Sequence, residues 1–163
     1  MQQYNDIHQS IEAFTRLVQS FSDLYPKAPI AVFGFSQGGV MSVRALHLAP
    51  HLYRAVASLS GYWMDHNYMS NKTISKMTRS QKPSLSTAKP IAKPIAKRPL
   101  PQLMVAHGKQ DRIVPFTEAK KLQSKFINEG YPVKFLSFDG AHRIPKNVIQ
   151  DLIDFLSQAF KSQ

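Results

Sequence analysis

One glycine-rich hexapeptide, GFSQGG at residues 34–39, constrains this chain more than any other feature. The apolar run PIAVF at residues 29–33 predicts a buried strand before it, and residues 40–49 predict a helix after it, which Pro50 closes. The chain must therefore turn sharply at Ser36. We expect this turn to hold Ser36 in a strained backbone conformation, with no room for a side chain at Gly34 or Gly38.

A Gly-x-Ser-x-Gly sequence between a strand and a helix is typical of the nucleophile elbow of serine hydrolases. The turn pushes the serine hydroxyl out of the sheet, towards the N-terminus of the following helix. Free backbone N–H groups and the helix dipole favour a developing negative charge at that place. Short motifs also recur by chance, so a glycine-rich turn with an incidental serine is the alternative on these residues alone.

Two further polar segments follow strand-like runs in the order that a hydrolase needs. The apolar residues 103–106 run into HGKQDRIVP, which contains Asp111, and the alternating residues 133–138 run into DGAH, which ends at His142. Open α/β sheets bind their ligands at the carboxyl ends of their strands. We therefore predict Ser36 as the nucleophile, His142 as the base that takes its proton, and Asp111 as the acid that orients His142.

Other polar residues compete for these roles. His107 also follows a strand, but it shares a turn with Asp111, so we expect it to cap that loop. Asp139 lies three residues before His142 and could orient it, although it resembles a turn residue before a glycine. We prefer Asp111 because it comes from a separate strand end. The other histidines have no partner pattern and are expected in solvent or packing positions: His8, His47, His51 and His66.

Together, GFSQGG, the HGxxDxxVP segment at residues 107–115 and the GxH that ends at His142 resemble the phospholipase/carboxylesterase family. That family includes acyl-protein thioesterases and bacterial carboxylesterases. The LSGY sequence at residues 59–62 fits the same pattern, and the resemblance spans roughly residues 1–63 and 101–160. Dienelactone hydrolases are less similar because they use a cysteine nucleophile, and this chain has no cysteine.

The resemblance implies an α/β-hydrolase fold and a catalytic triad of Ser36, Asp111 and His142. It also implies that the backbone N–H of Gln37 lies in the oxyanion hole. The expected substrates are carboxylic esters, lysophospholipids or acyl thioesters, cleaved through an acyl-enzyme with no cofactor and no metal.

The start of the chain departs from the family pattern. Relatives have several strands before the helix with which this chain opens, and one of them leads into a His-Gly loop that supplies a second oxyanion N–H. We therefore expect a truncated fold in which the strand near residues 29–34 is an exposed edge, covered by a second copy or by a missing N-terminal segment. Loss of one oxyanion donor costs about 10²–10³ in turnover, so we expect weak catalysis.

A second departure is a basic, proline-rich insertion at about residues 67–100. Residues 71–98 contain eight Lys or Arg and no acidic residue, and AKPI occurs twice in tandem. Proline at every fourth residue favours an extended path. We expect a solvated loop, with a lid or a weak contact with anionic surfaces as the alternatives.

Composition limits the remaining possibilities. The 163 residues predict one domain, 1–163, and the net charge of +11 depends largely on the insertion, which holds eight of the 21 basic residues. We therefore predict no specific nucleic-acid binding. The absence of cysteine excludes disulfides and zinc–cysteine sites. No leader peptide or membrane-length apolar run is visible, which predicts a cytoplasmic protein.

The periodicity predicts four parallel strands near residues 29–34, 54–59, 102–107 and 133–138, flanked by helices. One helix is expected over 117–129, with Gly130 as its stop. The first helix should bury a stripe of Ile7, Ile11, Phe14, Val18, Phe21 and Tyr25. The last helix should bury a stripe of Val148, Ile149, Leu152, Ile153, Leu156 and Phe160.

The first hypothesis is thus a serine ester or thioester hydrolase. The second is a catalytically weak or inactive fragment or interaction module that keeps the triad residues. The third is a prolyl-oligopeptidase-like serine peptidase, which shares the elbow and the triad order. That peptidase reading lacks a visible propeller, and its elbow more often carries an aromatic residue where this chain has Gln37.

Overall fold

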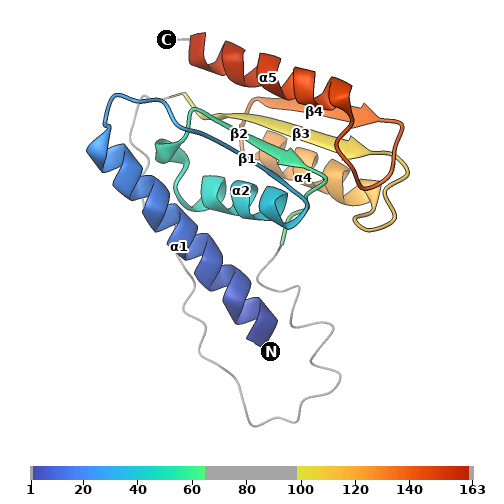
Figure 1. Ribbon diagram of the computed structural model, residues 1–163, viewed down its shortest axis with the longest axis horizontal. Helices are drawn as coiled ribbons and strands as arrows, with labels where there is room; N and C mark the ends of the chain where they lie inside the picture. The colour runs from blue at the N-terminus through green and yellow to red at the C-terminus, as the bar shows by residue number, and fades with distance from the viewer. Residues whose placement is uncertain (1, 65–98, 162–163) are drawn as a thin grey trace.

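The computed structural model describes residues 2–64 and 99–161 (Figure 1). The insertion predicted at 67–100 therefore lies outside the described residues, except for its last two positions. The first half contains α1 (Gln2–Leu24), β1 (Ala31–Phe35), α2 (Gln37–Leu48), the short 3₁₀ helix η1 (Pro50–Leu52) and β2 (Ala55–Leu59). The second half contains β3 (Gln102–Gly108), α4 (Phe116–Asn128), β4 (Val133–Phe138) and α5 (Lys146–Lys161).

The four strands form one parallel sheet in the order β1-β2-β3-β4. This confirms the expected α/β architecture and the positions of its strands. Because the strands run in one direction, their carboxyl ends meet at a single edge, which is on the right in Figure 1. Any side chains displayed by the loops at this edge are thus brought together, however far apart they are in sequence.

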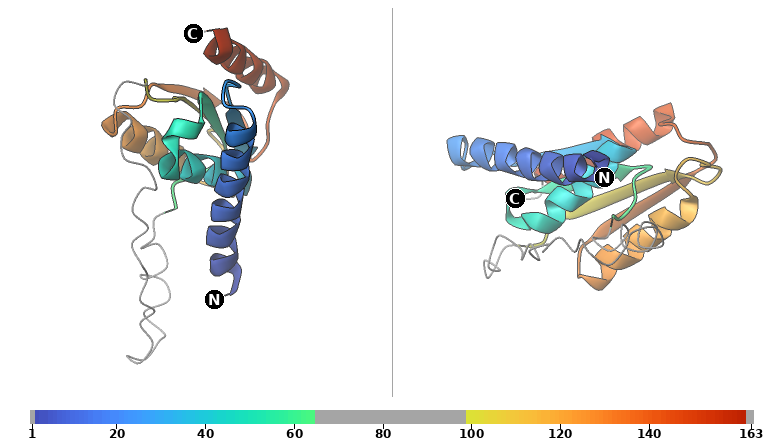
Figure 2. Two further views of the ribbon diagram at one scale, coloured as in Figure 1. Left: turned by 90° about the vertical axis from the view of Figure 1, so that its left-hand side faces the viewer. Right: turned by 90° about the horizontal axis from the view of Figure 1, so that it is seen from below.

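Helices cover the two faces of the sheet unequally. Helices α1, α2 and α4 lie on one side and α5 alone lies on the other (Figure 1, Figure 2). Successive side chains of the central strands point to opposite faces of the sheet. Val56, Leu103 and Val105 pack towards α2 and α4. Ala57 and Met104 pack towards α5. Burial on both faces explains why β2 and β3 read as continuous apolar runs.

Strand β1 is an edge strand, which confirms the exposed edge expected for it. The interpretation of residues 29–33 as a buried strand is wrong, because residues 31–35 are half-buried or exposed. At its two ends, the carbonyl of Ile30 and the N–H of Ser36 bond to the β2 side. Backbone groups alternate in direction along a strand, so the N–H and C=O groups of Ala31, Phe33 and Phe35 point to the open side. The Phe33 side chain is 57% exposed. Within the described residues no strand pairs with this side, so what covers it stays a prediction.

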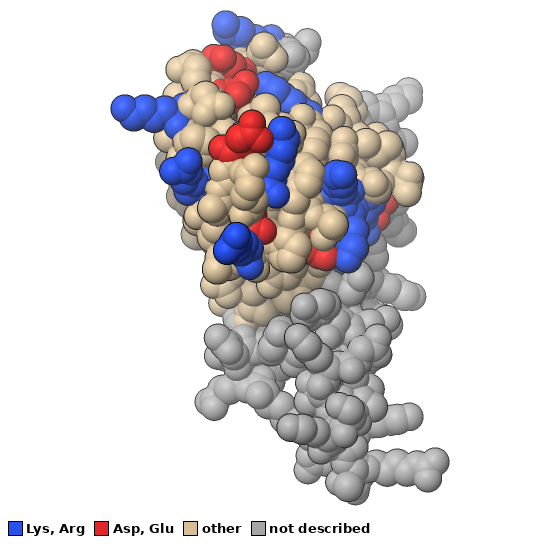
Figure 3. Space-filling view, turned by 90° about the vertical axis from the view of Figure 1, so that its right-hand side faces the viewer, with Lys and Arg blue, Asp and Glu red and all other residues tan. Residues whose placement is uncertain are grey.

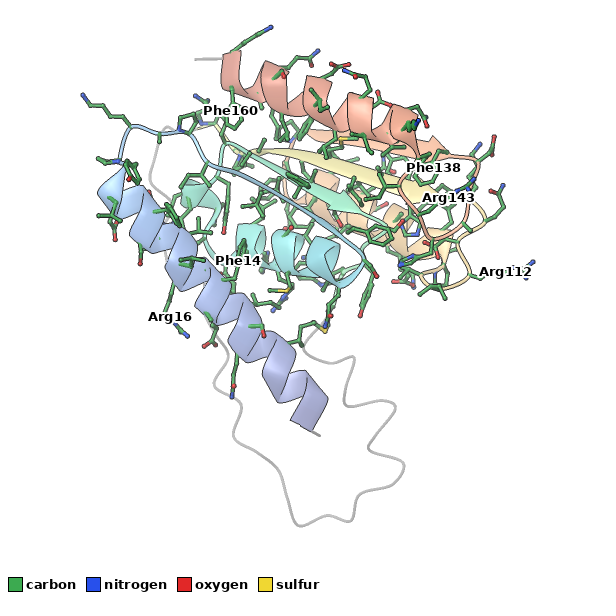
Figure 4. All side chains as sticks on the ribbon, in the orientation of Figure 1. Phe14, Arg16, Arg112, Phe138, Arg143 and Phe160 are labelled. Atoms are coloured by element: carbon green, nitrogen blue, oxygen red, sulfur yellow. The ribbon has the colours of Figure 1, made fainter. Side chains whose placement is uncertain are left out.

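The buried stripes of two helices also differ from the expectation. In α5 the sheet contacts Val148, Leu152, Phe155 and Ala159, whereas Ile149, Ile153 and Phe160 are 40–50% exposed. Phe160 is labelled in Figure 4 at the end of this helix. Apolar residues on the flank of a helix satisfy the same sequence periodicity, but a single sheet face cannot reach all of them.

Helix α1 packs against α2 and η1 rather than across the sheet. Ile7, Ile11 and Val18 are buried there, but Phe21 is 53% exposed, and Tyr25, which follows the end of the helix, is 59% exposed. No helix among residues 2–64 and 99–161 combines the length and the apolar character needed to cross a lipid bilayer.

The face onto which the strand ends open is shown in Figure 3. On it, Lys and Arg side chains are interspersed with acidic and uncharged residues and form no continuous basic patch. Among the described residues, this mixture of charges reflects the mild net charge of the chain outside the insertion.

Candidate active site

The turn between β1 and α2 has the strained geometry predicted for it. Ser36 adopts φ 54° and ψ −119°, a conformation that residues with a side chain rarely take. Its N–H donates to the carbonyl of Leu59 at the end of β2, at 2.8 Å. The helix begins at the next residue, Gln37. The neighbouring strand thus fixes the turn, and the serine side chain stands at the carboxyl edge of the sheet.

The glycines around Ser36 have different roles. A Cβ on Gly34 would lie 2.2 Å from the carbonyl carbon of Gly38, so this position must be glycine. A Cβ on Gly38 would meet nothing within 4 Å, so the expectation that Gly38 has no room is wrong. Gly39 is the second crowded position, since its Cβ would lie 2.8 Å from the hydroxyl of Ser58. Because the helix begins at Gln37, a side chain at position 38 would point away from the strand, although the backbone of Gly38 lies against Gly34.

The structure brings Ser36, His142 and Asp111 together in one chain of hydrogen bonds. His142 Nε2 lies 2.9 Å from Ser36 Oγ, although 106 residues separate them in sequence. His142 Nδ1 lies 2.7 Å from Asp111 Oδ2. A carboxylate only accepts, so Nδ1 carries the proton and Nε2 is left as the acceptor for the serine hydroxyl. The arrangement can therefore move a proton from Ser36 to His142.

Asp111 is held by its own loop, the segment between β3 and α4. Its Oδ1 accepts hydrogen bonds from the backbone N–H groups of Ile113 and Val114, both at 2.9 Å, and its side chain is fully buried. Burial alone would raise the pKa of Asp111. The hydrogen bond with His142, the two backbone donors and the charge of His142 outweigh burial, so the pKa lies below its ordinary value. Asp111 is accordingly ionised at neutral pH.

Of the competing residues, neither takes part in the hydrogen bonds to Ser36 and His142. The side chain of Asp139 is 81% exposed and pairs with Lys109 at 3.2 Å, not with His142. The His107 ring is fully buried, and its Nε2 lies 2.9 Å from the carbonyl of Val114, so it caps the loop of Asp111 as predicted.

Two features that hold His142 in place were not predicted from the sequence. The ring of Phe35 lies 4.7 Å from the ring of His142, centroid to centroid, and so packs beside it. The loops after β3 and β4 also touch: a Cβ on Gly108 would lie 2.3 Å from the carbonyl oxygen of Gly140. The Gln110 N–H donates to that same oxygen at 3.0 Å. The available signal was a glycine at the end of one strand and another glycine two residues after the next strand.

Two arginines and one backbone N–H group lie next to the candidate site in the sequence. Arg112 and Arg143, labelled in Figure 4, are the exposed neighbours of the acid and the base in their loops. The N–H of Gln37 belongs to the first residue of α2 and so has no acceptor within the helix. That is the property an oxyanion donor needs, and the role stays a prediction. In the described part of the chain no cluster of His, Asp and Glu is placed to hold a metal ion.

We predict that Gly34→Ala and Gly38→Ala have opposite consequences. Gly34→Ala must displace the backbone of Gly38, and should cost about 1–3 kcal/mol or more of the free energy of unfolding. Gly38→Ala adds a methyl group in open space within a helix, and should be neutral or stabilising by up to about 1 kcal/mol. Urea unfolding of both variants makes the comparison. Equal losses would contradict the account of the turn.

A second prediction concerns acid. Because folding lowers the pKa of Asp111 from its ordinary 3.8, ionised Asp111 stabilises the fold above that value, and the contribution is lost as the pH falls through the lower folded pKa. Between about pH 5 and pH 2 the wild type should therefore lose more stability than Asp111→Asn. Thermal unfolding across this range measures the difference. Parallel curves for the two proteins would show that Asp111 is not stabilised by its partners.

Known proteins with the same architecture were then compared with the chain. Esterase PE8 superposes with a TM-score of 0.68 at 17% identity, covering 94% of this chain and 61% of its own. The Bacillus cereus carboxylesterase gives 0.68 at 11% identity, covering 96% and 63%. Zea mays acyl-protein thioesterase 2 gives 0.59 at 16% identity, covering 91% and 65%. At these identities the likeness shows the fold, and the chain spans under two thirds of each structure.

Sequence comparison gives the family. No curated protein matches the chain significantly. The family model described as Phospholipase/Carboxylesterase matches residues 1–160, which is nearly the whole sequence. The match includes the turn at Ser36 and the two loops that carry Asp111 and His142. The chain therefore belongs to the phospholipase/carboxylesterase family of α/β-hydrolases.

Proposed function

We propose that this chain is a serine hydrolase that cleaves acyl esters or thioesters through a covalent acyl-enzyme. The observation that carries the proposal is the hydrogen-bond chain from Ser36 Oγ to His142 Nε2 and from His142 Nδ1 to Asp111 Oδ2. A serine on a strained turn, a histidine in hydrogen-bond reach and a buried carboxylate behind it are the three groups that nucleophilic acyl transfer needs.

In the proposed reaction, Ser36 Oγ attacks the acyl carbonyl while His142 Nε2 takes the hydroxyl proton. Asp111 stabilises the resulting imidazolium through its bond to Nδ1. The oxygen of the tetrahedral intermediate becomes negative beside the N-terminus of α2, where the N–H of Gln37 is the proposed donor. His142 then returns the proton to the leaving alcohol or thiol, and a water molecule hydrolyses the acyl-enzyme by the same steps.

The proposed substrates are carboxylic esters, lysophospholipids and acyl thioesters. This range is supported by the family match and by the similarity to a carboxylesterase and to an acyl-protein thioesterase. The same comparisons favour ester and thioester cleavage over the peptidase alternative. We assign no residue among those described to the selection of one acyl chain over another.

A second candidate function is that of a weak or inactive module. It is favoured by Gln37, which is the only oxyanion donor that we assign among the described residues. Since one oxyanion donor is worth about 10²–10³ in turnover, a site with a single donor would be slow. The two candidates thus differ in rate, not in the arrangement of Ser36, His142 and Asp111.

We expect the chain to hydrolyse p-nitrophenyl esters at a rate that depends on Ser36. Ser36→Ala should reduce hydrolysis to the background of the buffer. Asp111→Asn should lower kcat by about 10⁴, because the histidine loses the partner that fixes its tautomer. Acetyl, octanoyl and palmitoyl esters, assayed in parallel, would rank acyl-chain preference.

Ser20→Ala is the matched control, because Ser20 is an exposed serine of α1 that bonds only within its own helix. This variant should keep the wild-type rate. Hydrolysis that survives in Ser36→Ala would contradict the assignment of the nucleophile. A folded wild type with no hydrolysis above background would favour the inactive module.

A further inference from the structure

A buried histidine that the proposed reaction does not use lies directly behind the acid. His107 is in β3, where it pairs in register with Ser137 of β4, and its side chain is fully buried. It lies four residues before Asp111, on the rigid side of the loop that carries the carboxylate. A side chain in this place can fix the loop that carries Asp111 relative to the sheet.

The His107 ring holds the far end of that loop. Its Nε2 lies 2.9 Å from the carbonyl oxygen of Val114, and because a carbonyl only accepts, Nε2 carries the proton. The N–H of the same residue, Val114, donates to Asp111 Oδ1 at 2.9 Å. Val114 is thus tied to the strand through its carbonyl and to the carboxylate through its amide. A shift of Val114 would move one of the two backbone donors that fix Asp111.

His107 also lies close to the carboxylate itself. Its Nε2 is 3.4 Å from Asp111 Oδ2, the oxygen that accepts the hydrogen bond from His142. The other ring nitrogen, Nδ1, is buried with no hydrogen-bond partner among the described residues. An unpaired buried nitrogen costs free energy, and an apolar side chain would fill this space without that cost. The specific contribution of the ring must therefore come from Nε2–H.

We propose that His107 is a positioning residue for acyl transfer: its Nε2–H fixes Val114, and thereby the Asp111 carboxylate, where it can orient His142. This inference rests on the proposed function. Within the described residues, the Asp111 carboxylate accepts hydrogen bonds from the N–H groups of Ile113 and Val114 and from His142. The bond from His107 to Val114 ties one of these donors to β3 and so helps to fix the carboxylate. Misplacement of a catalytic group by about 1 Å can cost about 10²-fold in rate.

The test compares two amides at position 107. Glutamine can place its side-chain N–H near the position of Nε2 and keep the bond to Val114, whereas asparagine is too short to reach it. His107→Leu removes the donor altogether. Leu152→Ala is the control for loss of stability alone, because Leu152 belongs to α5 and is buried against the opposite face of the sheet.

The readout is the downfield proton resonance of His142 Nδ1–H, identified as the signal that is absent from His142→Ala and Asp111→Asn. It reports the bond to Asp111 whether or not the protein hydrolyses esters. We expect the signal in the wild type, His107→Gln and Leu152→Ala, and its loss in His107→Asn and His107→Leu. In ester hydrolysis, kcat/KM should fall by about 10²-fold in His107→Asn and less than about tenfold in His107→Gln.

These outcomes separate the inference from the proposed function. An unchanged resonance in folded His107→Asn would overturn the positioning role, even if hydrolysis were lost. Loss of the signal in Leu152→Ala as well would show that His107 contributes only to stability, and this result would also overturn the positioning role. If the resonance follows the expected pattern but no variant hydrolyses esters, the positioning of Asp111 stands and the proposed catalysis fails.

Discussion

The contact between the loops that follow β3 and β4 is the constraint on which the site depends. The register of the two strands, with Gly108 opposite Phe138, brings the loops to the same edge. Because Gly108 has no side chain, its backbone can lie against Gly140, and the 2.7 Å hydrogen bond between Asp111 and His142 then becomes possible. A bulkier residue at position 108 would separate the acid from the base while leaving the sheet intact. The arrangement of Asp111 and His142 is thus a consequence of backbone packing.

Ser36 is held in place differently from Asp111 and His142. Ser36 follows the edge strand β1, so only β2 and α2 hold its turn, through the bond of its N–H to Leu59 and the close packing of Gly34. The acid and the base follow β3 and β4, which pair with each other along their length. Among the described side chains, Ser36 contacts His142 through one hydrogen bond, and the ring of Phe35 packs beside the same histidine. We expect the position of Ser36 to be the most easily disturbed part.

Where local chemistry decides the outcome, the sequence predicted the fold and the three residues that meet at the candidate site. Strands, turns and the order of Ser36, Asp111 and His142 follow from periodicity and glycine placement, and the structure brings those three residues together. It could not predict which apolar residues of α1 and α5 are buried, because periodicity does not say how wide a face the sheet covers. Nor could it show the open space at Gly38, which depends on where α2 begins.

The most direct test of the account is intact-mass analysis after treatment with a fluorophosphonate probe, with peptide mapping of the adduct. A fluorophosphonate reacts with a serine that a neighbouring base has activated, so it reports the assembled site without the need for a known substrate. The account predicts one adduct per chain, located on Ser36. A folded chain that stays unlabelled, or one labelled on another serine, would contradict it.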